Sequence, residues 1–147
     1  QVLAELGWQK VFHRIRIGPG KAVGFGLLDK KPVFILAGGP SSNLMGFLQI
    51  ALPGLLARSG YTNPGLPRIK ARLATEIRGG KLDWTDFFYG IIEHDGGGMP
   101  VFYPKEKRVR LTAIAEATAV AAIPEGQDCL AAGATIDVQL LGSGLNY

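Results

Sequence analysis

Short apolar runs separated by glycines and polar turns characterise the first part of this chain. Residues 8–17 alternate between apolar and polar positions, which predicts a strand. Residues 33–36 form a continuous apolar run typical of a short buried strand. A glycine-dense loop over residues 18–26 follows the first strand. The apolar residues Leu27 and Leu28 and a polar turn at residues 29–32 then precede the run at 33–36. We expect a hairpin-like pair at a sheet edge, although a parallel pair fits the same pattern.

A helix is predicted over residues 40–58, where apolar residues dominate. Pro40 suits the first helical position, where its missing N–H costs nothing. Pro53 removes one backbone hydrogen bond, so the helix should kink or divide there. We expect Gly60 to end this helix, and residues 1–7 to be the end of another helix.

The pattern changes after residues 61–67, which contain two prolines and one glycine and predict a linker. Short strand-like runs follow it, a spacing that predicts a small β-barrel or a sandwich. We therefore divide the chain into an α/β part (1–60), a linker (61–67) and a β-barrel domain (68–147). The expected strands cover residues 68–76, 84–93, 100–103, 119–123 and 134–141, with a helical turn at 111–117.

A candidate anion site lies where the strand at 33–36 turns into the helix. We expect Gly38 and Gly39 to supply unusual φ angles or a close backbone approach. The first helical turn then offers free N–H groups and the positive end of the helix dipole, together with the side chains of Ser41, Ser42 and Asn43. Taken alone, these residues fit a plain tight connection better than a site. A second glycine loop, which carries Lys21, favours an anion site.

Both glycine segments resemble sequences of a known family. Residues 17–26 (IGPGKAVGFG) and 36–43 (LAGGPSSN) are similar to the end of the pterin-binding domain of MoeA-type molybdopterin molybdenumtransferases, relatives of the gephyrin E domain. The family pattern is Lys-Pro-Gly-Lys-Pro, then Leu-Pro-Gly-Asn-Pro-Val-Ser. The likeness continues to Ile123-Pro124-Glu125-Gly126 near the end of the chain. It implies a fragment: the end of a MogA/MoeA-like α/β domain followed by a small all-β barrel.

The resemblance also implies a chemistry. Proteins of this family insert molybdenum from molybdate into the dithiolene of adenylylated molybdopterin, and Mg²⁺ assists the release of AMP. Molybdopterin and molybdate or tungstate would be the substrates of this chain, and a homodimer would be its assembly. Mg²⁺ would bind through the upstream part of the protein.

Only part of the family motif carries over. Lys21 matches the second lysine of the loop, Gly20 lies in its turn, and Ser42 matches the serine of the second motif. The first lysine is replaced by Gly18, and the asparagine of Gly-Asn-Pro by Gly39. The anion- or pterin-binding residues that we expect are Gly20, Lys21, Gly38, Gly39, Ser41, Ser42 and Asn43.

Further departures concern the barrel. A family arginine aligns near Tyr89, and the family's Gln-Gly-Ser stretch aligns near residues 106–108, although Arg108 and Arg110 could restore positive charge nearby. The catalytic residues therefore stay unassigned, and the chain resembles a divergent paralogue. Three hypotheses remain open: part of an active insertase, a non-catalytic pterin- or anion-binding module, and a dimerisation module.

Charge and composition narrow the classes of ligand. Residues 1–67 carry seven Lys or Arg against two acidic residues, whereas the rest of the chain is nearly balanced. The basic residues are dispersed and accompany no nucleic-acid-binding signature, so an anionic small molecule fits better than nucleic acid. The apolar run at 44–57 is too short to span a bilayer. A single cysteine, Cys129, excludes an internal disulfide framework, and we expect a cytoplasmic protein.

The remaining polar and aromatic candidates have simpler interpretations. His13 lies on a predicted strand and fits a packed or partly exposed side chain. His94, with Glu93 and Asp95, fits a solvated turn better than a metal site. No Cys/His spacing indicates zinc, so no metal ligands are assigned. The aromatic residues at 84–89 are typical of barrel core.

Overall fold

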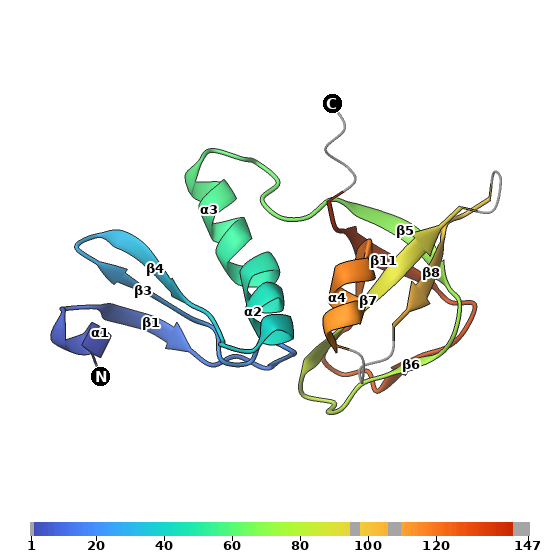
Figure 1. The fold of residues 1–147 in the computed structure, drawn as a ribbon, viewed down its shortest axis with the longest axis horizontal. Coiled ribbons are helices and arrows are strands. Elements are labelled where there is room, and N and C mark those ends of the chain that lie inside the picture. The colour runs from blue at the N-terminus through green and yellow to red at the C-terminus, as the bar shows by residue number, and fades with distance from the viewer. Residues whose placement is uncertain (1, 95–97, 106–109, 143–147) are drawn as a thin grey trace. The chain divides into compact units, whose positions relative to one another are not determined.

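The computed structural model describes residues 2–94, 98–105 and 110–142. The chain forms two compact units, Gln1–Gly65 and Leu66–Tyr147, which are drawn in Figure 1. Each unit has its own sheet and its own set of buried residues. The two units are therefore described separately.

The first unit contains a three-stranded antiparallel sheet. Its strands are β1 (Gln9–His13), β3 (Gly24–Leu28) and β4 (Lys31–Ile35), in the order β1-β3-β4. Asp29 and Lys30 join β3 to β4, and both have positive φ (49° and 63°), as a tight type I′ hairpin turn requires. The hairpin prediction is confirmed, and its arrangement is antiparallel. Pro32 is accommodated because β4 is an edge strand.

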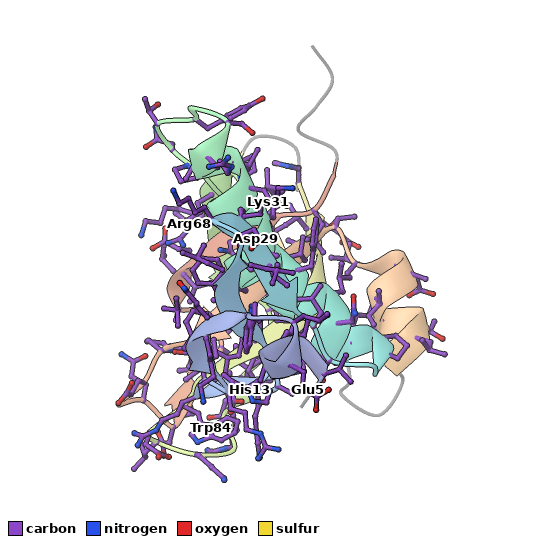
Figure 2. The ribbon with its side chains drawn as sticks, turned by 90° about the vertical axis from the view of Figure 1, so that its left-hand side faces the viewer. Glu5, His13, Asp29, Lys31, Arg68 and Trp84 are labelled. Atoms are coloured by element: carbon purple, nitrogen blue, oxygen red, sulfur yellow. The ribbon has the colours of Figure 1, made fainter. Side chains whose placement is uncertain are left out.

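The register of this sheet gives it two distinct ends. His13 pairs with Gly24, and Gly24 pairs with Ile35, so β1 and β4 end where β3 begins. The hairpin turn lies at the opposite end. Figure 2 shows Asp29 and Lys31 at the turn and His13 away from them. The connections that leave β1, enter β3 and leave β4 therefore all lie at one end of the sheet.

Two predicted boundaries in this region were wrong. The strand expected over residues 8–17 stops at His13, because Arg14 adopts a positive φ of 67°, and a separate two-residue strand, β2 (Ile17–Gly18), follows. The loop expected over residues 18–26 ends before β3 at residue 23. Gly26 is a strand residue over which the indole of Trp8 packs directly, leaving no room for a Cβ. This glycine is needed for a close approach within the sheet, not for a turn.

Short helix α1 (Val2–Glu5) precedes β1, and one long helical segment follows β4. The latter consists of α2 (Pro40–Gly46), the π-helical turn η1 (Phe47–Ala51) and α3 (Leu52–Arg58). The N–H of Leu52 donates to the carbonyl of Phe47, five residues back, just before Pro53. The helical segment continues through Pro53, so the expected division was wrong, and the disturbance there takes the form of this wider turn. Gly60 ends the helix at a φ of 90°, as expected.

The core of the first unit lies between the helix and the hairpin. Its buried apolar side chains are Val23, Met45, Leu48 and Ala51. A Cβ added to Gly54 would lie 2.8 Å from Cζ of Phe34, so α3 passes very close to β4. The rings of Phe25 and Phe34, neighbours on β3 and β4, lie 5.0 Å apart. Small residues on the helix and aromatic residues on the hairpin thus fit each other.

The second unit is a small closed barrel of five strands (Figure 1). The strand order is β7-β8-β5-β11-β9, and β9 pairs back with β7. The β5–β8 pair is parallel, and the other pairs are antiparallel. The predicted fold class, an α/β portion followed by a small β-barrel, is confirmed. The strands are β5 (Arg68–Leu73), β7 (Thr85–Glu93), β8 (Val101–Pro104), β9 (Ala119–Ile123) and β11 (Thr135–Leu140).

Alternation along β5 follows the sequence prediction. Ala71 and Leu73 are buried, whereas Arg68, Lys70 and Arg72 are exposed. Helix α4 (Arg110–Glu116) lies between β8 and β9, where the sequence predicted a helical turn. The pair β6 (Ile77–Arg78) and β10 (Cys129–Leu130) was not predicted, because two-residue strands leave no periodic signal. The barrel core comprises Ala71, Leu73, Ile77, Phe88, Phe102, Ala119, Ala121, Ile123, Ile136 and Val138.

Among the residues that the structure describes, no helix combines the length and apolar character that crossing a bilayer requires.

Replacing Gly90 with alanine should destabilise the barrel. A Cβ at this buried position of β7 would overlap the ring of Phe102 and lie 2.6 Å from the carbonyl oxygen of Tyr103. We expect Gly90→Ala to lower the free energy of unfolding by about 1 to 3 kcal/mol, because overpacking forces neighbours to shift. Urea unfolding monitored by fluorescence measures this change. Gly80→Ala is the control, since its Cβ would lie 3.6 Å from Asp86 Oδ2, an ordinary contact; equal losses in both variants would refute the packing argument.

Candidate functional site

Three connections meet at the end of the sheet opposite the hairpin turn. The chain leaves β1 through residues 14–16, enters β3 through residues 19–23 and leaves β4 through residues 36–39. The predicted glycine loop and the predicted strand-to-helix turn are two of these three. The fold therefore places both candidate segments at one end of the same sheet.

Gly20 positions the loop against the helix. Its φ is 115°, a backbone conformation that residues with a side chain rarely adopt, and a Cβ there would lie 3.0 Å from Cδ1 of Ile17. The same Cβ would lie 3.3 Å from the backbone nitrogen of Gly46, in the last residue of α2. Gly46 is in turn close to Val23, since its own Cβ would lie 3.5 Å from that side chain. Backbone conformation and close packing both require glycine at position 20.

Lys21 follows Gly20 on a loop whose backbone is held by hydrogen bonds. The N–H of Ile15 donates to the carbonyl of Lys21 (3.1 Å), and the N–H of Arg14 donates to the carbonyl of Val23 (2.9 Å). The N–H of Val23 donates to the carbonyl of Gly20 (3.1 Å), which closes a tight turn. The Lys21 residue is exposed. The loop thus presents a cation at a fixed backbone position.

The strand-to-helix turn differs from the expectation in one respect. Gly39, the N-cap residue, has φ −74° and ψ 133°, and neither Gly38 nor Gly39 has a positive φ. A Cβ on either residue would meet nothing within 4 Å. The proposed need for unusual φ angles or close approach at these glycines was therefore wrong. Both positions are exposed, and their missing side chains leave the entrance to the helix open.

Asn43 stabilises the turn from the first helical turn. Its side-chain nitrogen Nδ2 donates to the carbonyl of Ala37 (2.9 Å), and its backbone N–H donates to the carbonyl of Gly39 (2.8 Å). One of its side-chain donor hydrogens is therefore engaged within the protein. Ser41 and Ser42 are half-buried in the same turn, where helical N–H groups have no acceptor inside the helix. Asn43 orients this turn, and the two serines add hydroxyl groups to it.

The two predicted segments contact the long helix at different positions along its axis. The Gly20 loop approaches the helix at Gly46, and the strand-to-helix turn enters it at Pro40. Six helical residues correspond to about 9 Å. A small ligand at the first turn of α2 would therefore have to be reached across this distance by the side chain of Lys21.

The barrel candidates give a different picture. Tyr89, where the family has an arginine, is buried in β7. Residues 106–108 and Asp95 lie outside the described residues, as does the side chain of Arg110. His13, Glu93 and His94 are exposed. Among the described residues, no three His, Cys, Asp or Glu side chains gather as a metal site requires.

Cys129 stays without an assigned chemistry. A hydrogen bond with Asp128 and partial desolvation raise the pKa of its thiol above the usual value. A raised pKa favours the thiol over the reactive thiolate at neutral pH.

Sequence comparisons identify relatives of the whole chain. The chain is 32% identical over 143 residues to a molybdopterin molybdenumtransferase of Synechococcus elongatus, covering 95% of this chain and 34% of that protein. It is 27% identical over 145 residues to a putative molybdopterin biosynthesis protein of Methanocaldococcus jannaschii, covering 96% of this chain and 32% of that protein. No protein-family model matches the chain. The chain spans about a third of the length of the curated relatives that it matches.

Solved structures agree with these relatives. A molybdopterin biosynthesis MoeA protein of Pyrococcus horikoshii superimposes with a TM-score of 0.74 at 28% identity, covering 95% of this chain and 33% of that structure. A molybdenum cofactor biosynthesis protein of Pyrococcus furiosus has a TM-score of 0.73 at 19% identity, covers 91% of this chain and 46% of that structure, and supports the fold alone. The fold is therefore that of the C-terminal part of MoeA proteins. The homologues of this chain are MoeA-type molybdopterin molybdenumtransferases, and the resemblance seen in its glycine motifs is confirmed.

Replacing Asn43 with alanine should loosen the strand-to-helix turn. The lost hydrogen bond to Ala37 contributes about 1 kcal/mol, and the better helix propensity of alanine offsets about half of this. We expect faster amide hydrogen exchange in the first turn of α2 with little change in global stability. Asn63→Ala, an exposed linker substitution, is the control. Unchanged exchange in Asn43→Ala would show that the side chain does not hold the turn.

Proposed function

We propose that this chain contributes to the insertion of molybdenum or tungsten, supplied as an oxyanion, into adenylylated molybdopterin. The observation that carries the proposal is the exposed Lys21 on a fixed loop, at the same sheet end as the open turn before α2. The names of the relatives support molybdenum cofactor biosynthesis as the process. This function concerns the full-length protein, of whose relatives the chain spans a third.

The proposed role of the first unit is to hold a dianion. Molybdate keeps a tight hydration shell in water, so a site must replace that shell with positive charge and hydrogen-bond donors. Lys21 supplies the charge, and the hydroxyls of Ser41 and Ser42 with the first helical turn supply donors. Gly20 shapes the backbone of the loop, Gly38 and Gly39 leave the entrance to the helix open, and Asn43 fixes the turn.

The magnesium ion implied by the resemblance finds no acidic cluster among the described residues. The first unit has only two acidic residues, Glu5 and Asp29, and Asp29 lies at the hairpin turn, away from Lys21. The described residues do not fit a magnesium site, so no step is assigned to that ion in this part of the protein. Its proposed place is the upstream part of the protein.

A non-catalytic pterin- or anion-binding module is the second candidate function. It is favoured by Gly18 in place of the first loop lysine and by the buried Tyr89 in place of an arginine. Both changes remove a cation that the resemblance assigns to oxyanion binding. Such a module would bind the ligand and leave it unchanged.

We also propose a homodimer. The edge strand β1 carries Val11 with 61% of its surface exposed, and the neighbouring α1 region adds Val2 (68%) and Leu6 (61%). Exposed apolar residues beside an unpaired strand edge favour association with another strand.

Lys21→Ala should abolish molybdenum insertion in the full-length protein. The measurement is the molybdenum content of the cofactor formed from adenylylated molybdopterin and molybdate, determined by mass spectrometry. Lys31→Ala, which removes an exposed cation beside the hairpin turn, is the matched control and should retain activity. Normal insertion by Lys21→Ala would contradict the proposal. Molybdopterin binding without insertion in the unsubstituted protein would select the module instead.

Charge placed on the exposed edge should disrupt the proposed dimer. We expect sedimentation velocity to give a dimer for the full-length protein and a monomer for its Val11→Lys variant, because a lysine at the edge opposes strand pairing. Leu111→Lys, which alters an exposed apolar residue of the barrel unit, is the control. A monomeric unsubstituted protein, or a dimeric Val11→Lys variant, would argue against this interface.

A further inference from the structure

We infer that Arg14 is a second anion-binding residue of this site, acting beside Lys21 on a tetrahedral dianion. The inference rests on the proposed function and adds a residue that the sequence motif did not indicate. Its ligand class is a molybdate-like oxyanion or a phosphate ester, which share size, charge and geometry. Three observations lead to it: the backbone of Arg14, its link to the Lys21 loop, and the distribution of charge in the first unit.

Arg14 has a backbone conformation that arginine rarely adopts. Its φ of 67° interrupts the strand directly after His13, in the left-handed region. For a residue with a Cβ this conformation costs about 1 to 2 kcal/mol. The hairpin residues Asp29 and Lys30 share it, but a type I′ turn requires it there. At position 14 glycine or asparagine would be the usual residue, so the presence of arginine points to its side chain.

The Lys21 loop is bound directly to this unusual residue. Arg14 donates its N–H to the carbonyl of Val23, and the next residue, Ile15, donates to the carbonyl of Lys21. Arg14 and Lys21 are both exposed. The two cations are therefore carried by backbone segments one hydrogen bond apart, and the position of one constrains the position of the other.

Charge is unevenly distributed over the first unit. Its two acidic residues are Glu5 in α1, before β1 begins, and Asp29 at the hairpin turn, whereas Arg14, Arg16 and Lys21 belong to the connections at the other end of the sheet. Both acidic residues of this unit therefore lie outside the segments that carry Arg14 and Lys21.

The two cations would act differently on such a ligand. The guanidinium of arginine is a planar fork that donates two parallel hydrogen bonds to an oxyanion, whereas an ammonium acts as a point charge. Arg14 would orient the tetrahedral group, and Lys21 would neutralise it. A cation at position 14 also offsets the lysine that the resemblance places at Gly18.

The test separates the side chain of Arg14 from its backbone. Arg14→Gly removes the guanidinium and relieves the positive φ, so this variant should fold at least as stably as the unsubstituted protein. Lys30→Gly is the matched control, because it removes an exposed cation from another positive-φ position at the far end of the sheet. Calorimetric titration of the full-length proteins with molybdate, and separately with inorganic phosphate, measures binding.

We expect Arg14→Gly to weaken binding at least tenfold and Lys30→Gly to change it less than twofold. Thermal unfolding should confirm that Arg14→Gly remains folded. A larger loss with molybdate would identify the metal oxyanion as the ligand, and a larger loss with phosphate would identify the phosphate ester. Binding by Arg14→Gly equal to that of the unsubstituted protein would overturn the inference, as would the absence of any anion binding.

Failure of the inference can be told apart from failure of the proposed function. If Lys21→Ala loses insertion while Arg14→Gly binds normally, the function stands and the role of Arg14 falls. If Arg14→Gly loses phosphate binding in a protein that inserts no molybdenum, the anion site stands and the proposed insertase activity falls.

Discussion

The candidate site depends on the close approach of two backbones, the Gly20 loop and the end of α2. Gly20 cannot readily carry a side chain at the contact, because its φ is 115° and a Cβ there would lie 3.3 Å from the nitrogen of Gly46. The contact fixes the position of the loop along the helix axis. The hydrogen bonds from Arg14 and Ile15 then fix its other side. Lys21 is consequently presented by a rigid support, which a site for a small, strongly hydrated dianion requires.

The barrel is held together by a different constraint, closure of its sheet. The β7–β9 pair removes the two free edges that an open five-stranded sheet would leave. Closure also crowds the interior of the barrel. Because Gly90 has no side chain, it leaves the space that the ring of Phe102 fills. The buried Tyr89 is part of the same strand. A residue there packs within the barrel unit, which fits the loss of a charged side chain at this position.

Much of the fold could be predicted from sequence, because most strands show clear periodicity or strong apolar character. The alternation along β5 and the apolar runs of β7 and β9 located the barrel strands, and Pro53 indicated the disturbance in the helix. The end of β1 could not be predicted, because nothing in the sequence marks Arg14 for a positive φ. The roles of the glycines were equally hidden. Gly20 and Gly26 are needed for close contacts, whereas Gly38 and Gly39 meet nothing, and composition alone cannot separate these cases.

The π-helical turn η1 controls which way the two ends of the long helix face. Gly46 and Gly54, which meet the loop and Phe34, are eight residues apart. In an uninterrupted α-helix, eight residues turn the helix about 80° past two full turns. The five residues of η1 follow the wider i→i+5 pattern and rotate less per residue, which offsets this excess. The reduced rotation lets one helical segment meet the loop at Gly46 and the hairpin at Gly54.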